Sequence, residues 1–226
     1  MTIPPIKALL FMKGHSERVP GKNLRPLCGR PLFHWILKSL AACQYIQEII
    51  INTDSEQIAR GAQDHFNVTI HMRPEYLLNI HSNEAYQLMA YDLEHTDGEY
   101  FLQSHSTNPL LRTATIDRAI ETFFEQSEYD SLFSVTPIQK RFFKEDGTAI
   151  NHDPNHLIKT QHLPKLLEED SCIYLFSRRV FFERENRIGY HPLLFPMDKF
   201  ESVDIDEEYD FFLAEAMMNH RQQQEG

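Results

Sequence analysis

Positively charged residues and glycines are concentrated in one short segment of the chain, residues 13–23. Its cations are Lys13, Arg18 and Lys22, and its glycines are Gly14 and Gly21. Cations offset the charge of phosphate groups, and glycines let backbone N–H groups come close to phosphate oxygens. The segment is therefore suited to hold a nucleoside triphosphate, although it lacks the GxxxxGK[ST] pattern of a Walker A loop. The alternative is an ordinary solvated basic loop.

A pair of carboxylates lies near the end of the chain, in the sequence Val203-Asp204-Ile205-Asp206. In an extended segment alternate side chains share a face, so both carboxylates would point one way and the two apolar residues would face the core. Two neighbouring carboxylates favour a hard cation such as Mg²⁺, which completes its shell with substrate phosphates. The alternative is that Asp206 caps the final helix, with the two glutamates that follow complementing the helix dipole.

A third polar cluster, Asn52-Thr53-Asp54, directly follows an apolar run. Polar groups at the carboxyl end of a strand are suited to recognise a ribose or a metal ion. The alternative is a helix N-cap, because a helical pattern begins just after Ser55.

The overall charge of the chain is strongly negative. The 226 residues carry a formal net charge of −11, which argues against a nucleic-acid or membrane-surface partner. Cations that bind a triphosphate must therefore be placed locally. Three cysteines without CxxC spacing argue against a disulfide framework or a zinc site. No apolar run reaches the length of a membrane span, and the first residues lack a signal-peptide pattern, so we predict a cytoplasmic protein.

The apolar pattern predicts strands and helices in alternation. Strands are expected at residues 6–12, 46–52, 68–71, 99–104, 131–137 and 172–176. Helices are expected at residues 31–43, 56–64, 82–94, 113 or 115 to 125, and 206–220; the last would have an apolar stripe of Tyr209, Phe212, Leu213, Ala216 and Met217. This alternation is typical of a parallel sheet covered by helices, whose ligands bind at the carboxyl ends of the strands. Residues 138–169 break the pattern over too long a stretch for a simple loop, so we expect a protruding arm.

The order and spacing of several segments resemble a known family. The segments are SERVPGKNLRPLCGRPLFHW, IIINTDSEQIA, MRPEYL, STNPLLRTATID, SCIYLF and ESVDIDEEYDFFLAEA. Between about Ile6 and Met217 the chain resembles the acylneuraminate cytidylyltransferases, which are the CMP-sialic acid and CMP-Kdo synthetases. The resemblance implies a single domain over residues 1–226, with the three-layer α/β sandwich of nucleotidyltransferases and a mostly parallel sheet. It also implies that the arm at about 138–169 crosses the interface of a homodimer.

The same resemblance implies a reaction. The anomeric hydroxyl of a nonulosonate-type sugar acid would attack the α-phosphorus of CTP directly, releasing pyrophosphate and leaving a CMP-activated sugar. Mg²⁺ would lie on Asp204 and Asp206, and these two residues with Lys22 would form the catalytic set.

Binding residues follow from the resemblance as well. For the nucleotide they are Lys13, Gly14, Ser16, Arg18, Lys22 and Asn23 in the loop, with Arg73, Ser82 and Asn83 around the pyrimidine. For the sugar acid they are His105, Lys144, Lys159 and Tyr174.

Four positions depart from the family pattern. Lys13 replaces the Arg of sialate-type members, Glu17 replaces a basic residue, His105 replaces Gln, and Glu168 replaces an Arg near the acceptor. Lys lacks the bidentate geometry of Arg, and Arg18 is the residue that can compensate. Because the departures leave the aspartate pair and Lys22 intact, we expect the reaction class to be kept, whereas the acceptor need not be N-acetylneuraminate. The alternatives are a cytidylyltransferase for another acid, such as a Kdo-like sugar or a phosphonate, and a catalytically silent paralogue that binds nucleotide.

Overall fold

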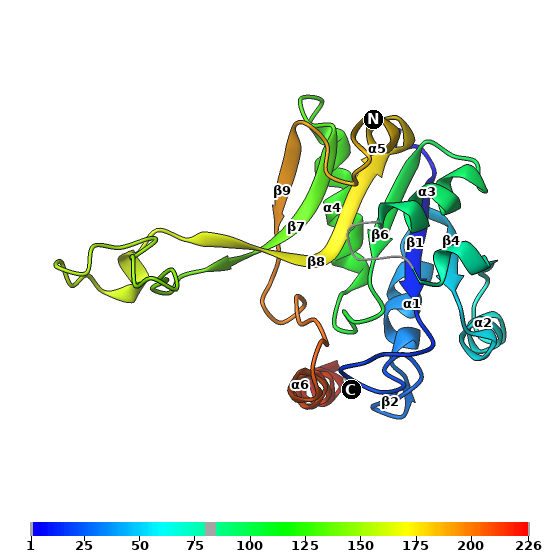
Figure 1. Cartoon of the computed structure of the whole chain (residues 1–226), viewed down its shortest axis with the longest axis horizontal. Coiled ribbons are helices and arrows are strands. Elements are labelled where there is room, and N and C mark those ends of the chain that lie inside the picture. The colour runs from blue at the N-terminus through cyan, green and yellow to red at the C-terminus, as the bar shows by residue number, and fades with distance from the viewer. Residues whose placement is uncertain (1, 80–84, 226) are drawn as a thin grey trace.

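One seven-stranded sheet forms the centre of the computed structural model, which describes residues 2–79 and 85–225 (Figure 1). From one edge to the other the strands are β5 (Thr69–Met72), β4 (Ile46–Thr53), β1 (Ile6–Met12), β6 (Tyr100–Ser104), β8 (Leu166–Ser177), β7 (Ser131–Ile138) and β9 (Pro192–Pro196). The first four are mutually parallel, β8 is antiparallel to both β6 and β7, and β9 is parallel to β7. The prediction of a mostly parallel sheet is confirmed.

Helices cover both faces of this sheet. Helices α1 (Phe33–Ala41), α2 (Glu56–Gln63) and α4 (Thr113–Glu125) share one apolar cluster with Ala8 and Leu10 of β1. Helices α3 (Tyr86–Glu94) and α5 (Arg178–Arg184) share another cluster with Leu9, because successive side chains of a strand point to opposite faces. The molecule therefore has the three layers that the sequence predicted.

The loops that contain the predicted site residues follow the carboxyl ends of neighbouring strands, which together form one end of the sheet. Because β4, β1 and β6 are parallel neighbours, their carboxyl ends lie side by side. The segment 203–206 joins this edge: the Ile205 N–H donates to the Thr107 carbonyl at 3.0 Å, and the Asn108 side chain donates to the Val203 carbonyl at 3.5 Å. Ile205 is fully buried, which fixes the segment against the loop that follows β6.

The last helix, α6 (Glu208–Glu225), packs through a different face from the predicted one. Phe211, Ala214 and Met218 are buried, whereas Tyr209 and Phe212 are 71% and 63% exposed. Both sets have helical spacing, so the sequence pattern could not choose between them. The buried set shares an apolar cluster that includes Trp35 and residues of the hairpin formed by β2 (Pro26–Leu27) and β3 (Arg30–Pro31). The predicted apolar stripe of α6 is therefore wrong, because the helix packs on this cluster through the other set of residues.

Three other elements differ from expectation. Residues 202–206 are irregular and not a strand. Helix α5 was not predicted; it has only seven residues, and the Ser177 hydroxyl caps it by accepting from the Val180 N–H at 3.2 Å. Strand β9 was not predicted either, because prolines at both of its ends argue against a central strand. It lies at the edge of the sheet, where proline is tolerated.

A long arm projects from the body of the molecule (Figure 1). Strands β7 and β8 continue beyond the sheet as a two-stranded ribbon, in which Ile138 pairs with Leu166. Residues 139–165 form its tip, which contains the short 3₁₀ helix Thr160–His162. The arm occupies the stretch in which the sequence pattern broke up.

Candidate active site

The loop after β1 is held against the segment 203–206 by its cations. The Lys22 ammonium donates to the Ile205 carbonyl oxygen at 2.5 Å and lies 3.8 Å from the Asp206 carboxylate. The Arg18 guanidinium donates to the same carboxylate at 2.7 Å. The predicted phosphate-binding loop and the predicted carboxylate pair therefore form one site, although they are far apart in the sequence.

Burial perturbs the charged groups at the centre of this site. Desolvation lowers the pKa of Lys22, although the carboxylates of Asp206 and Asp204 act in the opposite direction. Desolvation also raises the pKa of Asp204. Charges in poorly solvated positions interact more strongly with a ligand, because the effective dielectric constant is lower there. The site is suited to a highly charged substrate.

One oxygen of Asp204 lacks a protein partner. Its Oδ1 atom is buried and accepts no hydrogen bond from the described residues. Such an atom is costly unless a donor or a cation completes it. Together with the half-exposed Asp206, it offers the carboxylate oxygens that Mg²⁺ prefers. Within the described part of the chain no three His, Cys, Asp or Glu residues gather as a metal site, so further ligands would come from phosphates and water.

The backbone at the start of α6 is not capped by Asp206. The N–H groups of Asp206 and Glu207 donate to Asp210 Oδ2 at 3.0 and 2.8 Å. The Asp206 carboxylate instead faces Arg18 and Lys22. The structure thus favours the site interpretation of Asp206 over the alternative of a helix cap.

Asn23 braces the phosphate-binding loop from inside. It is buried, its side-chain amide donates to the Lys13 carbonyl at 2.9 Å, and its oxygen accepts from the Ser106 hydroxyl at 2.7 Å. Asn23 therefore shapes the loop through hydrogen bonds to the chain itself. Ser16 contributes within the loop, where its hydroxyl accepts from the Val19 N–H at 3.4 Å.

Gly14 packs the loop closely on the end of β4. Its N–H donates to Asp54 Oδ1 at 2.6 Å, and a Cβ atom at position 14 would lie only 2.8 Å from the Ser55 Cβ atom. This approach requires glycine. Asp54 thus positions the loop, and the helix cap in this region is Ser55, whose hydroxyl accepts from the Ile58 N–H at 3.3 Å.

Arg73 lies in a buried polar network at the end of β4. Its Nε donates to Asn52 Oδ1 at 3.0 Å, and the Asn52 amide donates to Asp92 Oδ1 at 2.8 Å. His71 Nδ1 is also 2.8 Å from that oxygen of Asp92. Through these contacts Asn52 orients Arg73, and the cap of the following helix is Ser55 rather than Asn52.

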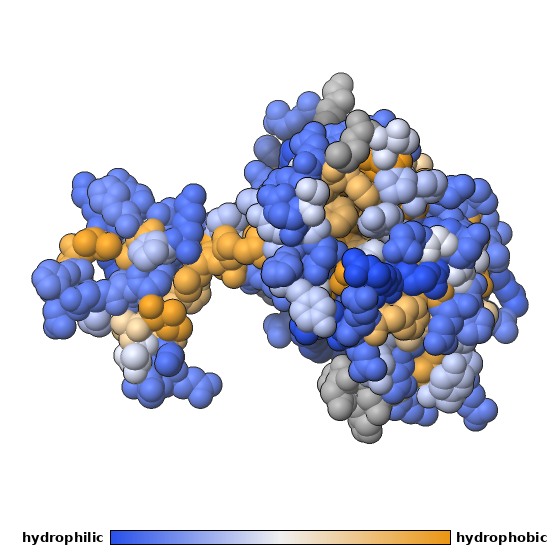
Figure 2. All heavy atoms as spheres, turned by 90° about the horizontal axis from the view of Figure 1, so that it is seen from above, coloured by the Kyte–Doolittle hydropathy of each residue, from blue (hydrophilic) through white to orange (hydrophobic). Residues whose placement is uncertain are grey.

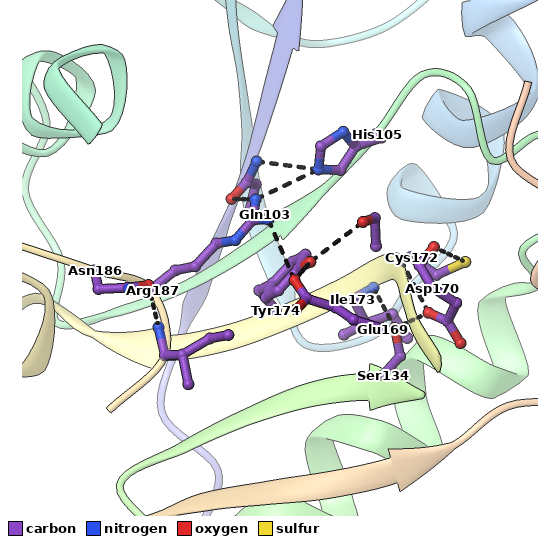
Figure 3. A network of polar contacts seen from close by, with 12 residues as sticks. Gln103, His105, Ser134, Glu169, Asp170, Cys172, Ile173, Tyr174, Asn186 and Arg187 are labelled. Atoms are coloured by element: carbon purple, nitrogen blue, oxygen red, sulfur yellow. Dashed lines mark hydrogen bonds and ion pairs between the residues drawn. The ribbon is translucent and has the colours of Figure 1, made fainter. Parts of the chain in front are cut away.

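A second polar group contains His105 and Tyr174, two residues predicted to contact the acceptor (Figure 3). The Arg187 guanidinium stacks 3.4 Å from the centroid of the Tyr174 ring, donates to Gln103 Oε1 at 2.7 Å, and lies 3.5 Å from His105 Nε2. The Tyr174 hydroxyl donates to Glu169, whose carboxylate is 3.8 Å from Arg187. We call Gln103, His105, Tyr174 and Arg187 the arginine cluster.

The imidazole of His105 is neutral at physiological pH. Burial lowers the pKa of His105 to about 4, and the positive charges of Arg187 and Lys22 act in the same direction. Ser106, the residue after His105, donates its hydroxyl to the Asn23 side chain at 2.7 Å, and this contact places the arginine cluster next to the phosphate-binding loop. The two polar groups therefore form adjoining parts of one site.

Comparison with known proteins assigns the family. The family model described as Cytidylyltransferase matches residues 8–222. The chain belongs to the cytidylyltransferase family. It is a nucleotidyltransferase enzyme with the residues of its site grouped at the carboxyl edge of the sheet.

Individual relatives of this cytidylyltransferase are distant. The post-translational flagellin modification protein B of Campylobacter coli is 24% identical, with 96% of both chains covered. The N-acylneuraminate cytidylyltransferase A of Danio rerio is 26% identical over 93% of this chain, which spans only 50% of that relative. The structure of a CMP:2-keto-3-deoxy-manno-octonic acid synthetase complexed with CTP has a TM-score of 0.71 at 12% identity, covering 96% of this chain and 99% of that one. This likeness shows the same fold.

Three lysines among the predicted binding residues of the cytidylyltransferase have exposed side chains, and two other predicted residues lie outside the described residues. Lys144 and Lys159 are exposed on the arm, which projects away from the body (Figure 1). The side chain of Lys13 is exposed at the start of the loop. Ser82 and Asn83 lie outside the described residues.

Two residues of the site were missed in the sequence. Gln103 stands at the end of β6, and Arg187 follows α5, a helix that was not predicted. No motif marks Arg187, which shares its segment with the exposed Arg179 and Arg184. The sequence did contain one signal for Gln103. It stands two residues before His105, so in an extended strand the two side chains lie on the same side.

Proposed function

We propose that this cytidylyltransferase transfers CMP from CTP to a nonulosonate-type sugar acid and releases pyrophosphate. The observation that carries the proposal is the grouping of Lys22 and Arg18 with Asp204 and Asp206 at the carboxyl edge of the sheet. A relative named for N-acylneuraminate supports the choice of acceptor. The polar group around His105 and Tyr174 adjoins the loop through the contact of Ser106 with Asn23 and provides a second binding region for that acceptor.

The residues of the chain act by positioning and by charge. Lys22, held by the Ile205 carbonyl, offsets the negative charge that grows on the phosphoryl oxygens and on the departing pyrophosphate. Arg18 is exposed enough to exchange Asp206 for a phosphate oxygen when CTP binds. No side chain needs to form a covalent intermediate, because the sugar hydroxyl attacks the α-phosphorus directly.

We also propose Mg²⁺ as the cofactor, held by Asp204 and Asp206. The buried Asp204 Oδ1 atom without a hydrogen-bond partner fits a hard cation. When bound, the ion would neutralise charge on the triphosphate. The ion would also affect Lys22. The Lys22 Nζ atom lies 3.8 Å from the Asp206 carboxylate, so this carboxylate would interact with both the lysine and the ion.

We propose further that two copies of the chain associate through the arm. Apolar side chains gather along the arm (Figure 2), where Phe143, Ile150 and Leu157 are 53%, 51% and 91% exposed. Exposed apolar surface of this extent is typical of an interaction site. Association would also bring the arm residues Lys144 and Lys159 to another copy.

Three free cysteines fit the reducing cytoplasm that we expect for the protein.

Light scattering tests the association. We expect a dimer at micromolar concentration and a weaker dimer for Leu157→Asp. The matched control is Phe212→Asp, which places the same charge on the exposed face of α6. A wild-type monomer, or equal weakening by both variants, would contradict the role of the arm.

Pyrophosphate release tests the proposed reaction. The protein is incubated with CTP, Mg²⁺ and one acid at a time: N-acetylneuraminate, legionaminate, pseudaminate, Kdn, Kdo and simple phosphonates. Release with a nine-carbon acid supports the proposal, whereas release only with Kdo or a phosphonate shows a cytidylyltransferase for another acid. No release while CTP still binds would indicate a silent paralogue. The intact contacts among Lys22, Ile205 and Asp206 argue against that outcome.

A further inference from the structure

A cavity of about 470 Å³ lies beside the arginine cluster. Its apolar lining includes Phe11, Leu88, Met89 and Phe181, and its polar lining includes three members of the cluster, Gln103, His105 and Arg187. Cavities of this size, with apolar walls and a few convergent polar groups, are typical of small-molecule sites. The cavity adjoins the phosphate-binding loop, because its lining residue His105 is followed by Ser106, which donates to Asn23 of that loop at 2.7 Å.

Arg187 brings a positive charge to this cavity with only weak compensation. Its side chain is 24% exposed, and its short hydrogen bond goes to the neutral oxygen of Gln103. Among the described residues, the carboxylate paired with Arg187 is that of Glu169, which is 3.8 Å away and 47% exposed. Burying a charge is costly unless an opposite charge is close. Arg187 is therefore suited to receive an anion from a ligand.

The neighbours of Arg187 fix the direction of its guanidinium. Stacking on Tyr174 and the hydrogen bond to Gln103 hold the planar group from two sides (Figure 3). His105 is neutral, so it neither repels Arg187 nor competes with it for an anion. A guanidinium that is ordered before binding loses less conformational entropy when a carboxylate pairs with it.

We propose that the arginine cluster binds the carboxylate of the acceptor acid and that Arg187 is the residue that pairs with it. This inference rests on the proposed function, because it assumes that the acceptor is a sugar acid. Arginine matches a carboxylate with two parallel N–H donors. The apolar wall of Phe11, Leu88 and Met89 then faces the carbon skeleton of the acid. Arg187 is thus a specificity-determining residue of the acceptor side.

Steady-state kinetics of Arg187→Met test this assignment. We expect the KM for the acid to rise about 30-fold or more, and the KM for CTP to stay within about twofold of the wild-type value. Arg187→Lys keeps the charge but loses the bidentate geometry, so it should recover part of the loss. The matched control is Arg184→Met, an exposed arginine three residues earlier that lies over Tyr190. Equal KM values for the acid in Arg187→Met and wild type would overturn the proposal.

A comparison of two acids shows whether Arg187 contacts the carboxylate or the acyl carbonyl of the acceptor. N-acetylneuraminate and Kdn both carry the carboxylate, but only the first has an N-acyl group. A carboxylate contact predicts the same fold-loss for both acids in Arg187→Met. A loss confined to N-acetylneuraminate would overturn the proposal, since Arg187 would then contact the acyl group.

Binding measurements keep this test independent of turnover. Isothermal titration of N-acetylneuraminate and Kdn into the protein with CMP present reads acid binding without reaction, and a melting curve shows whether each variant is folded. Weaker binding to folded Arg187→Met or Arg187→Lys than to wild type supports the assignment. Equal binding, or no binding of either acid to wild type, overturns it. Absence of pyrophosphate release with every acid would count against the proposed function alone.

Discussion

The proposed nucleotide side and the proposed acceptor side of the site are built in different ways. The nucleotide side consists of two continuous segments, residues 13–23 and 203–206, that contact each other directly through Lys22 and Ile205. The acceptor side takes single residues from β6, from β8 and from the segment after α5. A continuous segment keeps its chemistry as a unit, whereas scattered residues can change one at a time. We therefore expect the reaction class to be the constant part of this enzyme and the acceptor to be the variable part.

The two sides also differ in how their charges are balanced. On the nucleotide side two cations, Arg18 and Lys22, face two carboxylates, Asp204 and Asp206. On the acceptor side a single arginine lies among Gln103, a neutral His105 and Tyr174, with Glu169 at a distance. The first arrangement suits a triphosphate with its metal ion, and the second suits a substrate with one negative charge. Variants that remove one charge at a time should show this difference.

The largest effect is expected on the nucleotide side, from Lys22→Met. The variant removes a partly buried charge that, in the proposed reaction, stabilises the transition state, so kcat should fall about 10²- to 10³-fold. Stopped pyrophosphate-release assays at saturating CTP and acid measure this. Lys38→Met on the exposed side of α1 is the matched control and should leave kcat unchanged. A Lys22→Met variant that changes only the KM for the acid would place Lys22 on the acceptor side and break the comparison.

A smaller effect should separate Asp206 from its neighbour Asp210. Asp206→Asn removes the carboxylate that faces Arg18 and Lys22, so turnover should fall about 100-fold with little change in melting temperature. Asp210→Asn weakens the hydrogen bonds to the N–H groups of Asp206 and Glu207, so stability should fall by about 1 kcal/mol while most activity remains. Paired melting curves and rate measurements distinguish the two. The opposite result, a stability loss for Asp206→Asn with full activity, would restore the cap interpretation.

The neutral state of His105 gives the acceptor side a characteristic pH dependence. Its pKa is lowered to about 4 in the folded protein, so between pH 6.5 and 4 the unfolded chain binds a proton that the folded chain does not. Stability should therefore fall with falling pH, by about 2 kcal/mol between pH 7 and pH 5 from this residue. His105→Gln should lose less stability over that interval than wild type in urea unfolding. His220→Gln, an exposed control on α6, should follow the wild-type curve, and identical curves for all three proteins would mean that His105 is solvated.

The contrast between the two sides also explains what the sequence could reveal. Residues 13–23 and 203–206 carry their chemistry in short patterns, and the family resemblance chose between the alternatives that these patterns left open, so Lys22, Asp204 and Asp206 could be proposed before the structure was known. Alternation of apolar runs similarly predicted the layers and most strands. Arg187 could not be found, because its role depends on stacking against Tyr174, 13 positions earlier on another element. The face of α6 could not be found either, since two apolar stripes fit the helical period and only packing on Trp35 chose between them.

The smallest expected effect concerns an irregular stretch of β8, the strand that also contains Tyr174 of the acceptor side. The register of β7 and β8 shifts between Phe133 and Val135, and Ser171 in this stretch has a φ of 60°. A residue with a Cβ atom is strained in this left-handed conformation and glycine is not, so Ser171→Gly should stabilise the protein by about 0.5–1 kcal/mol. This corresponds to a rise in melting temperature of roughly 2 °C for a chain of this size.

Ser202→Gly, at a position without a positive φ, provides the control for this last variant and should lower the melting temperature because glycine gains entropy in the unfolded chain. The Ser171 hydroxyl also lies 3.3 Å from the Tyr174 hydroxyl, and because the single Tyr174 proton goes to Glu169, Ser171 is the donor of this long and therefore weak hydrogen bond. If Ser171→Gly lowers the melting temperature and raises the KM for the acid, that contact outweighs the backbone strain. The serine would then belong to the acceptor side as a residue that positions Tyr174, and β8 would contribute a second residue to that side.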